Sequence, residues 1–139
     1  MSDRIGNTAE TTAKDCIAVF NESKFARLME MTITDARDGY AEVVMETAGK
    51  TNPDGVAHGG AIFALADHAF GIAANCGGKN RVAVSVHILY IAPATGRLVA
   101  RAEQVADNGK YFTYRILVRE GERLIAEFEG ISLQVSPPV

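Results

Sequence analysis

Hydrophobic and polar residues alternate along much of the chain. In YAEVVMET (40–47), Ala41, Val43 and Met45 fall on one face and the glutamates on the other, which predicts a half-buried strand. Similar patterns predict strands over residues 27–36, 81–92, 97–106, 111–120 and 123–135. The pairs Asp38-Gly39 and Asn108-Gly109 lie between two such segments each and predict hairpins. In the last segment the apolar phase shifts near Gly130, which predicts a bulge or bend there.

One long segment departs from this alternation. Over residues 59–75 the apolar residues recur almost all round a helical axis, and Gly77-Gly78 follow where a left-handed cap is expected. Such a helix is buried on most sides, and a curved sheet would supply the contacts. A short helix is predicted over 12–23, and residues 1–10 are expected to be flexible. The order indicates an α+β domain, with an antiparallel sheet wrapped around a long central helix, spanning residues 1–139.

Composition narrows the function classes. The chain has 139 residues, of which 47% are hydrophobic, so one domain with a sizeable core is expected. The formal net charge is −3, which argues against a general nucleic-acid binder. The longest apolar run is broken by Asp67 and His68 and is too short for a membrane span. The first residues show no apolar signal-peptide segment, so we expect a cytoplasmic protein.

The two cysteines, Cys16 and Cys76, are too few for a disulfide framework in a domain of this size. We therefore expect two free thiols in a reducing compartment. Neither has the CxxC spacing of a metal or redox site, and a catalytic cysteine is not favoured.

The polar residues of the apolar helix carry the candidate chemistry. Asp67 stands in its middle, although aspartate prefers helix caps. The side chain either reaches solvent or a neighbouring chain, or it faces a cleft as a base or nucleophile. At the start of the helix, Gly59-Gly60 either permits close backbone packing or presents unpaired N–H groups to a developing oxyanion, aided by the helix dipole. His58 precedes them and would cap or position the helix.

Spacing then makes a prediction about assembly. Gly59 and Asp67 are eight residues apart, which is roughly 12 Å along one helix. One reacting carbonyl cannot touch both, whereas two antiparallel copies would bring Gly59 of one chain near Asp67 of the other. If both residues serve one site, the protein is at least a twofold dimer. Asn52, in the loop before the helix, is explained by turn chemistry on spacing alone, the alternative being an amide that holds water or a carbonyl.

Other kinds of site are not supported. A triad of Ser85, a histidine and Asp67 lacks a G-x-S-x-G elbow. His68 follows Asp67 directly, and neighbours in sequence point to different sides of a helix. Asp67 and the three histidines, His58, His68 and His87, do not have the spacing of a metal site. Neither a P-loop nor a dinucleotide fingerprint is present. We expect no metal and no cofactor.

The segment NPDGVAHGGAIFALADHAFGIAAN resembles the central signature of the hotdog-fold thioesterases, in their phenylacetate-degradation, PaaI-like branch. VSVHILYIAPA and GERLIAEFEGISLQV resemble the strands that follow in that family. The similarity covers about residues 24–135. In place of the serine or threonine and the aspartate that some relatives carry on the first of these strands, this chain has Ala83 and Ser85.

The resemblance implies hydrolysis of an acyl-CoA thioester. Gly59 would polarise the thioester carbonyl through its N–H, and Asp67 of a partner chain would attack or activate water. Asn52 would orient the water or the carbonyl, with His58 beside them. Dimers, often paired into tetramers, are usual in the family. The substrate-binding residues are predicted as a set: Gly60, Ser85, Val86, Lys110 and Tyr111.

Several questions stay open from the sequence. The predicted substrates are aryl-acyl or medium-chain acyl-CoA, with Phe63, Phe70, Tyr90 and Phe112 as candidate pocket residues. The cations for the CoA phosphates would come from Lys79, Arg81 or Lys110. The alternatives are a non-catalytic acyl-CoA-binding protein and a hotdog enoyl-CoA hydratase or dehydratase, in which His58 and Asp67 would transfer protons. No nucleic acid or membrane partner is expected.

Overall fold

The structure is a computed structural model that describes residues 8–135. The elements found there, in chain order, are α1 (Thr8–Phe20), α2 (Lys24–Leu28), β1 (Thr32–Arg37), β2 (Tyr40–Glu46), α3 (Gly59–Asn75), β3 (Arg81–Tyr90), β4 (Arg97–Asp107), β5 (Tyr111–Glu120) and β6 (Arg123–Gln134).

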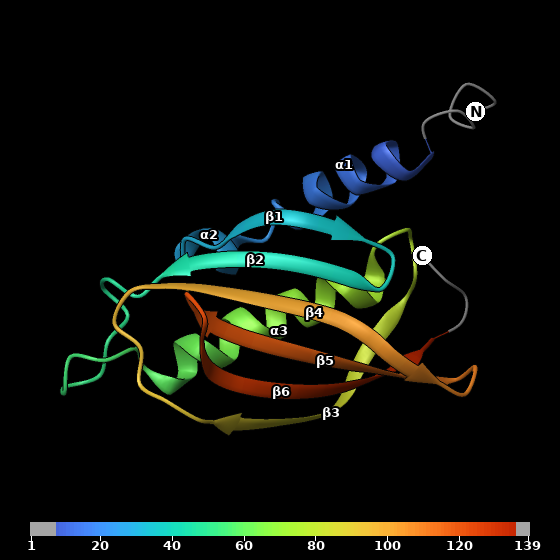
Figure 1. The fold of residues 1–139 in the computed structure, drawn as a ribbon. Helices are drawn as coiled ribbons and strands as arrows, with labels where there is room; N and C mark the ends of the chain where they lie inside the picture. Colours follow the sequence, from blue (N-terminus) through green and yellow to red (C-terminus); the bar gives the residue numbers. More distant parts are fainter. Residues whose placement is uncertain (1–7, 136–139) are drawn as a thin grey trace.

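The strands described form one antiparallel sheet in the order β1-β2-β4-β5-β6-β3, so that β1 and β3 are its edges (Figure 1). Helix α3 lies across one face of the sheet and packs mainly on β2, β4 and β5. This arrangement confirms the predicted fold class, a hotdog-type sheet around a long helix. Gly39 and Gly109 have φ values of 81° and 86° in the two predicted hairpins, in the left-handed region that favours glycine.

The N-terminal third differs from the prediction. The first helix runs over Thr8–Phe20 rather than 12–23, and α2 occupies the start of the predicted first strand. Ser23 caps α2, because its hydroxyl accepts a hydrogen bond from the N–H of Ala26 at 3.1 Å. The first strand, β1, therefore starts at Thr32, after this helix, rather than at residue 27. Of the predicted flexible segment, residues 1–7 lie outside the described residues, and residues 8–10 are the first residues of α1.

A bulge or bend is predicted at Gly130, and a bulge in β6 at that residue is wrong, because the nearby register shift lies in β3, between Ala83 and Ser85. Pairing of β6 with β5 and with β3 continues through Gly130 without a shift, and Ala126, Phe128, Gly130 and Ser132 are all buried along it. A Cβ at Gly130 would lie 2.7 Å from Cζ of Phe70. The glycine is therefore present because the α3 phenyl ring occupies the space over the strand.

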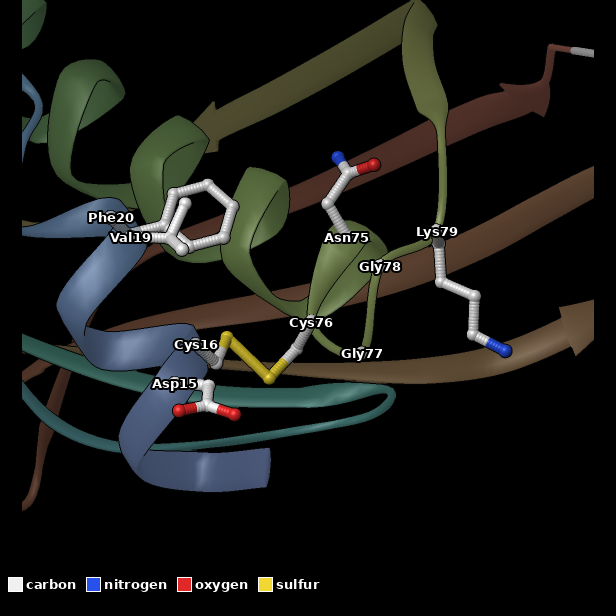
Figure 2. A pocket seen from close by; sticks show the side chains of 9 residues that line it. All are labelled: Asp15, Cys16, Val19, Phe20, Asn75, Cys76, Gly77, Gly78 and Lys79. Carbon is white, nitrogen blue, oxygen red and sulfur yellow. A yellow bond between two sulfur atoms is a disulfide. The ribbon is translucent and has the colours of Figure 1, made fainter. Parts of the chain in front are cut away.

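The prediction of two free thiols is also wrong, because Cys16 and Cys76 form a disulfide. Figure 2 shows the bond joining α1 to the end of α3. The two Cα atoms are 5.3 Å apart, within the range that a disulfide spans, although 60 positions separate the residues in sequence. Sequence spacing could not show this contact, since it depends on where α1 docks. None of the described helices is long and apolar enough to cross a membrane.

Candidate active site

The first turn of α3 leaves one backbone donor unused. His58 is the N-cap, and its Nδ1 accepts a hydrogen bond from the N–H of Gly60 at 2.8 Å. The N–H groups of Ala61 and Ile62 donate to the His58 carbonyl at 2.9 and 3.2 Å. Within residues 8–135 the Gly59 N–H has no hydrogen-bond acceptor. It lies at the positive end of the helix dipole and is free to donate to a ligand.

This arrangement distinguishes the two glycines, both of which are predicted from the sequence to present N–H groups to an oxyanion. The N–H of Gly60 is already bound by the His58 side chain, so Gly59 provides the available donor. Because Nδ1 of His58 accepts a hydrogen bond, a neutral imidazole carries its proton on Nε2. His58 is thereby placed beside the donor as a helix cap.

A cavity of about 350 Å³ opens next to Gly59. Its walls are mostly apolar and come from the start of α3 and the end of β3: Ala57, Gly59, Ile62, Tyr90, Ile91, Ala92 and Pro93. The Tyr90 hydroxyl donates a hydrogen bond to the Gly59 carbonyl at 3.1 Å. Among the four aromatic residues considered for a pocket, Phe70 and Phe112 are buried in the core, Phe63 is half-buried, and Tyr90 lines this cavity.

Asp67 lies in the middle of α3, on a stripe of the helix that the sheet leaves uncovered. The buried residues of α3 face the sheet, whereas Asp67 is exposed in the single chain. Its neighbours on the stripe are small or apolar: Gly60, Phe63, Ala64 and Gly71. Desolvation by these surroundings raises the pKa of the Asp67 carboxyl. A carboxylate on an otherwise apolar surface is suited to a base or nucleophile once a second surface covers it.

Asn52 organises the loop before α3. Its Oδ1 accepts hydrogen bonds from the N–H groups of Asp54 and Val56 at 2.9 and 3.3 Å. The Gly55 N–H donates to the Asn52 carbonyl at 3.0 Å. The turn function considered for Asn52 is therefore present. In the described part of the chain its Nδ2 makes no hydrogen bond and is left for a water or substrate oxygen.

His68 does not join Asp67 in a catalytic pair. It points toward α1, where its ring meets the edge of Phe20 with centroids 6.4 Å apart. Burial lowers the pKa of His68, and its buried Nε2 has no hydrogen-bond partner among the described residues. Ser85 is exposed on edge strand β3, next to a register shift between Ala83 and Ser85. The described geometry thus assembles no serine triad.

The remaining residues predicted to bind substrate lie on β3 and at the β4–β5 turn. Val86 is 38% exposed on the edge strand. Lys110 and Tyr111 are beside the start of β3, because Gln134 donates to the Lys110 carbonyl and pairs with Arg81. Tyr90 ends β3 at the opposite extreme, near Gly59. Lys110 and Tyr111 are therefore far from Gly59 within one chain.

The three candidate cations are used differently. Arg81 is half-buried, stacks over Phe112 at 3.6 Å and donates to the Tyr114 hydroxyl at 2.8 Å, so its guanidinium is engaged within the chain. Lys79 forms an ion pair with Asp38 at 3.6 Å. The Lys110 ammonium lies 5.5 Å from the Tyr111 ring and has no ion pair within residues 8–135. Lys110 is the cation most available to an anionic ligand.

A second cavity, of about 420 Å³, lies at the other end of α3 (Figure 2). It is lined by the disulfide, by Val19 and Phe20 of α1, and by the glycine turn that ends α3. Of the residues predicted to serve catalysis or substrate binding, Lys79, a candidate cation for the CoA phosphates, lines this cavity, whereas Gly59, Asp67, Asn52 and His58 do not. No group of three or more His, Cys, Asp or Glu side chains able to hold a metal ion occurs among the described residues.

Comparisons with known proteins identify related sequences and structures. The thioesterase superfamily profile matches residues 54–127. The acyl-coenzyme A thioesterase PaaI of Escherichia coli is 31% identical over 122 residues, which cover 85% of this chain and 87% of that protein. The E. coli PaaI structure superposes with a TM-score of 0.81 at 28% identity, over 87% of this chain and 91% of that one. A point-mutant structure of the phenylacetic acid degradation protein PaaI from Thermus thermophilus superposes with a TM-score of 0.77 at 33% identity, over 81% and 100% of the respective chains.

The chain therefore belongs to the thioesterase superfamily, in its PaaI-like hotdog branch. The resemblance noted in the sequence is confirmed, as is the thioester hydrolase class. The Tyr90–Gly59 hydrogen bond is the feature of the site that sequence reasoning missed. Its only sequence signal is an aromatic residue near Pro93 at the end of a strand.

Proposed function

We propose that the protein hydrolyses acyl-CoA thioesters with aryl-acyl or medium-chain acyl groups, with no cofactor other than the coenzyme A of the substrate. The observation that carries the proposal is the unpaired N–H of Gly59 at the start of α3, beside an apolar cavity. The name of the E. coli relative, an acyl-coenzyme A thioesterase, supports the substrate class. The Thermus relative, a phenylacetic acid degradation protein, supports an aryl-acyl group.

In this mechanism the thioester oxygen accepts a hydrogen bond from Gly59 N–H. Negative charge that develops on this oxygen is stabilised by the N–H and by the helix dipole. Asp67 then acts in one of two ways. As a base it takes a proton from water while the hydroxide adds to the carbonyl carbon. As a nucleophile it displaces the CoA thiolate to form an anhydride, which water cleaves. Both routes yield the free acid and coenzyme A and regenerate the carboxylate.

The site requires two chains. Gly59 and Asp67 are on one helix, roughly 12 Å apart at 1.5 Å per residue, so they cannot both reach one carbonyl carbon and its oxygen. Edge strand β3 carries exposed apolar side chains, namely Val82, Val84, Val86, Leu89 and Tyr90. An open apolar edge is a surface that a second chain would cover. A twofold dimer through β3 would set Asp67 of one chain against Gly59 of the other.

The same dimer would account for Lys110 and Tyr111. Antiparallel pairing of two β3 strands places the Arg81 end of one strand beside the Tyr90 end of the other. Lys110 of one chain would then lie at the same end of the dimer interface as Gly59 of the other chain, where its ammonium could bind a CoA phosphate. Ser85 and Val86, near the middle of β3, would line the path between them. The acyl group would occupy the cavity of about 350 Å³ beside Gly59.

Two substitutions at Gly59 isolate the role of its N–H. Gly59→Pro removes the N–H at the first helical position, where proline is well tolerated. His58 has φ −62° and ψ 135°, a conformation compatible with a following proline. Gly59→Ala keeps the N–H, and its Cβ would meet the Tyr90 ring at 3.5 Å, an ordinary contact. We expect kcat for thiol release to fall about 100-fold or more for Gly59→Pro and little for Gly59→Ala.

The assay is release of free thiol from phenylacetyl-, hydroxybenzoyl- and hexanoyl-CoA, with Asp67→Asn alongside. A loss of about 100-fold or more in Asp67→Asn would support the catalytic carboxylate. Tight binding without thiol release would leave a non-catalytic acyl-CoA-binding protein. Hydration of an enoyl-CoA without thiol release would indicate a hydratase. Sedimentation of the same samples would distinguish monomer, dimer and tetramer.

A further inference from the structure

Two side chains hold opposite ends of a single peptide unit at the start of α3. The carbonyl of the Gly59–Gly60 peptide accepts a hydrogen bond from the Tyr90 hydroxyl at 3.1 Å. The N–H of the same peptide donates to His58 Nδ1 at 2.8 Å. His58 is local to the helix, whereas Tyr90 reaches it from the end of β3, 31 positions away in sequence.

We propose that Tyr90 is a positioning residue that fixes the Gly59–Gly60 peptide and thereby aims the Gly59 N–H at the substrate carbonyl. The inference rests on the proposed function, in which that N–H is the oxyanion donor. The helix holds one side of Gly59 through the His58 carbonyl, which accepts hydrogen bonds from Ala61 and Ile62. The two glycines still have wide conformational freedom, so a side-chain restraint on the following peptide narrows the directions in which the Gly59 N–H points.

The packing of the Tyr90 ring supports this role. A Cβ built on Gly59 would lie 3.5 Å from Cζ and 3.6 Å from Cε1 of Tyr90, so the ring lies beside the glycine Cα. The hydroxyl and the ring therefore restrain the same residue, one by a hydrogen bond and the other by contact. The Gly59 carbonyl can accept the hydroxyl in addition to its helical partner, since a carbonyl oxygen has two lone pairs.

The position of Tyr90 is in turn fixed by the sheet. Tyr90 pairs with Ala126 of β6, and the next residue, Ile91, donates its N–H to the Ile125 carbonyl at 2.8 Å. The start of α3 is thus tied to the edge of the sheet through one side chain. Removing the Tyr90 hydroxyl leaves no carbonyl without a partner, because Gly59 is the first residue of α3 and its carbonyl keeps its helical hydrogen bond.

The test compares Tyr90→Phe, which removes only the hydroxyl, with Tyr40→Phe as a matched control. Tyr40 is on β2, where Arg37 stacks over its ring at 4.1 Å, away from α3's first turn. We expect Tyr90→Phe to lower kcat about 3- to 10-fold with KM within about twofold of wild type and the shape of the pH profile unchanged. Tyr40→Phe should match wild type.

A second readout does not depend on activity. In amide hydrogen exchange by NMR, Tyr90→Phe should speed exchange of Gly60 several-fold, because the peptide that carries this N–H loses one restraint. Exchange at Leu65 should stay unchanged. If wild type released no thiol, the proposed function would fail, and the exchange rates alone would still decide whether Tyr90 holds this peptide.

Three outcomes would overturn the proposal. Unchanged kcat together with unchanged exchange at Gly60 would show that the hydroxyl restrains nothing. A change in KM alone would make Tyr90 a binding residue. Loss of one limb of the pH profile would make the hydroxyl a proton donor in the reaction.

Discussion

The Nδ1 atom of His58 accepts a hydrogen bond from the backbone N–H of Gly60 at 2.8 Å, which makes the histidine the N-cap of α3. Although His58 lies beside the proposed active site, its Nδ1 is thus already engaged in a hydrogen bond to the helix backbone. This relationship leaves the Gly59 N–H as the donor proposed for the substrate and gives His58 a role that stability measurements can separate from catalysis.

The first prediction concerns this cap. His58→Ala should lower the free energy of unfolding by about 0.5–2 kcal/mol, because the Gly60 N–H loses its acceptor. His58→Ser should lower it less, since serine caps well. Urea unfolding of the three proteins measures the difference. Equal losses in the two variants would argue against capping, and a large loss of kcat at unchanged stability in His58→Ser would indicate a chemical role.

Asp67 should set the acidic limb of the pH–rate profile. The mechanism needs the carboxylate ionised, and desolvation raises its pKa above the ordinary value of 3.8. Activity should therefore fall with decreasing pH at a higher pH than for an ordinary aspartate. The measurement is kcat/KM against pH, checked by protein that stays folded across the range. An acidic limb at or below the ordinary aspartate value would contradict the assignment.

The same shift predicts the stability of Asp67→Asn. A folded-state pKa above the unfolded value means that the folded state favours the protonated acid. The wild type therefore loses stability as the pH rises from the unfolded-state pKa through the folded-state pKa, and the uncharged asparagine does not. Asp67→Asn should melt at a higher temperature than wild type at neutral pH, and the gap should close below the unfolded pKa. Thermal melts at fixed protein concentration test this, and destabilisation by the asparagine at neutral pH would contradict it.

The proposed sharing of active sites between two chains predicts complementation. Asp67→Asn and Gly59→Pro chains should each be nearly inactive alone. Unfolded together in equal amounts and refolded, about half of the dimers contain one chain of each kind, with one intact and one doubly defective site. The mixture should recover about a quarter of wild-type activity. Activity that stays at the level of the separate variants, with mixed dimers demonstrated by a tag, would place both groups of a site in one chain.

The disulfide predicts a loss of stability on reduction. A bond that closes a loop with a sequence separation of 60 restricts the unfolded chain, and its loss should cost about 2–4 kcal/mol. Cys16→Ser, Cys76→Ser and the reduced wild type should unfold at closely similar urea concentrations, below that of the oxidised protein. Thiol titration of the denatured, unreduced protein provides the control, and recovery of both thiols in each chain would contradict the bond.

Local pattern in the sequence was sufficient for most of the fold. Three patterns depend only on residues that are neighbours in sequence: strand alternation, the hairpin pairs at Gly39 and Gly109, and the apolar run of α3. Each element could therefore be predicted from its own segment. The position of Asp67 in that helix and the glycines at its start identified the candidate site in the same way. The family resemblance rested on these residues as well.

The tertiary structure decided what depends on residues distant in sequence. The phase of the last strand was misread at Gly130 because the reason for that glycine is the Phe70 ring of α3. The docking of α1 brought Cys16 to Cys76, and the end of β3 brought Tyr90 to Gly59. Each of these contacts joins two elements whose relative placement is fixed by packing of the whole core. The periodicity along one element therefore cannot predict such a contact.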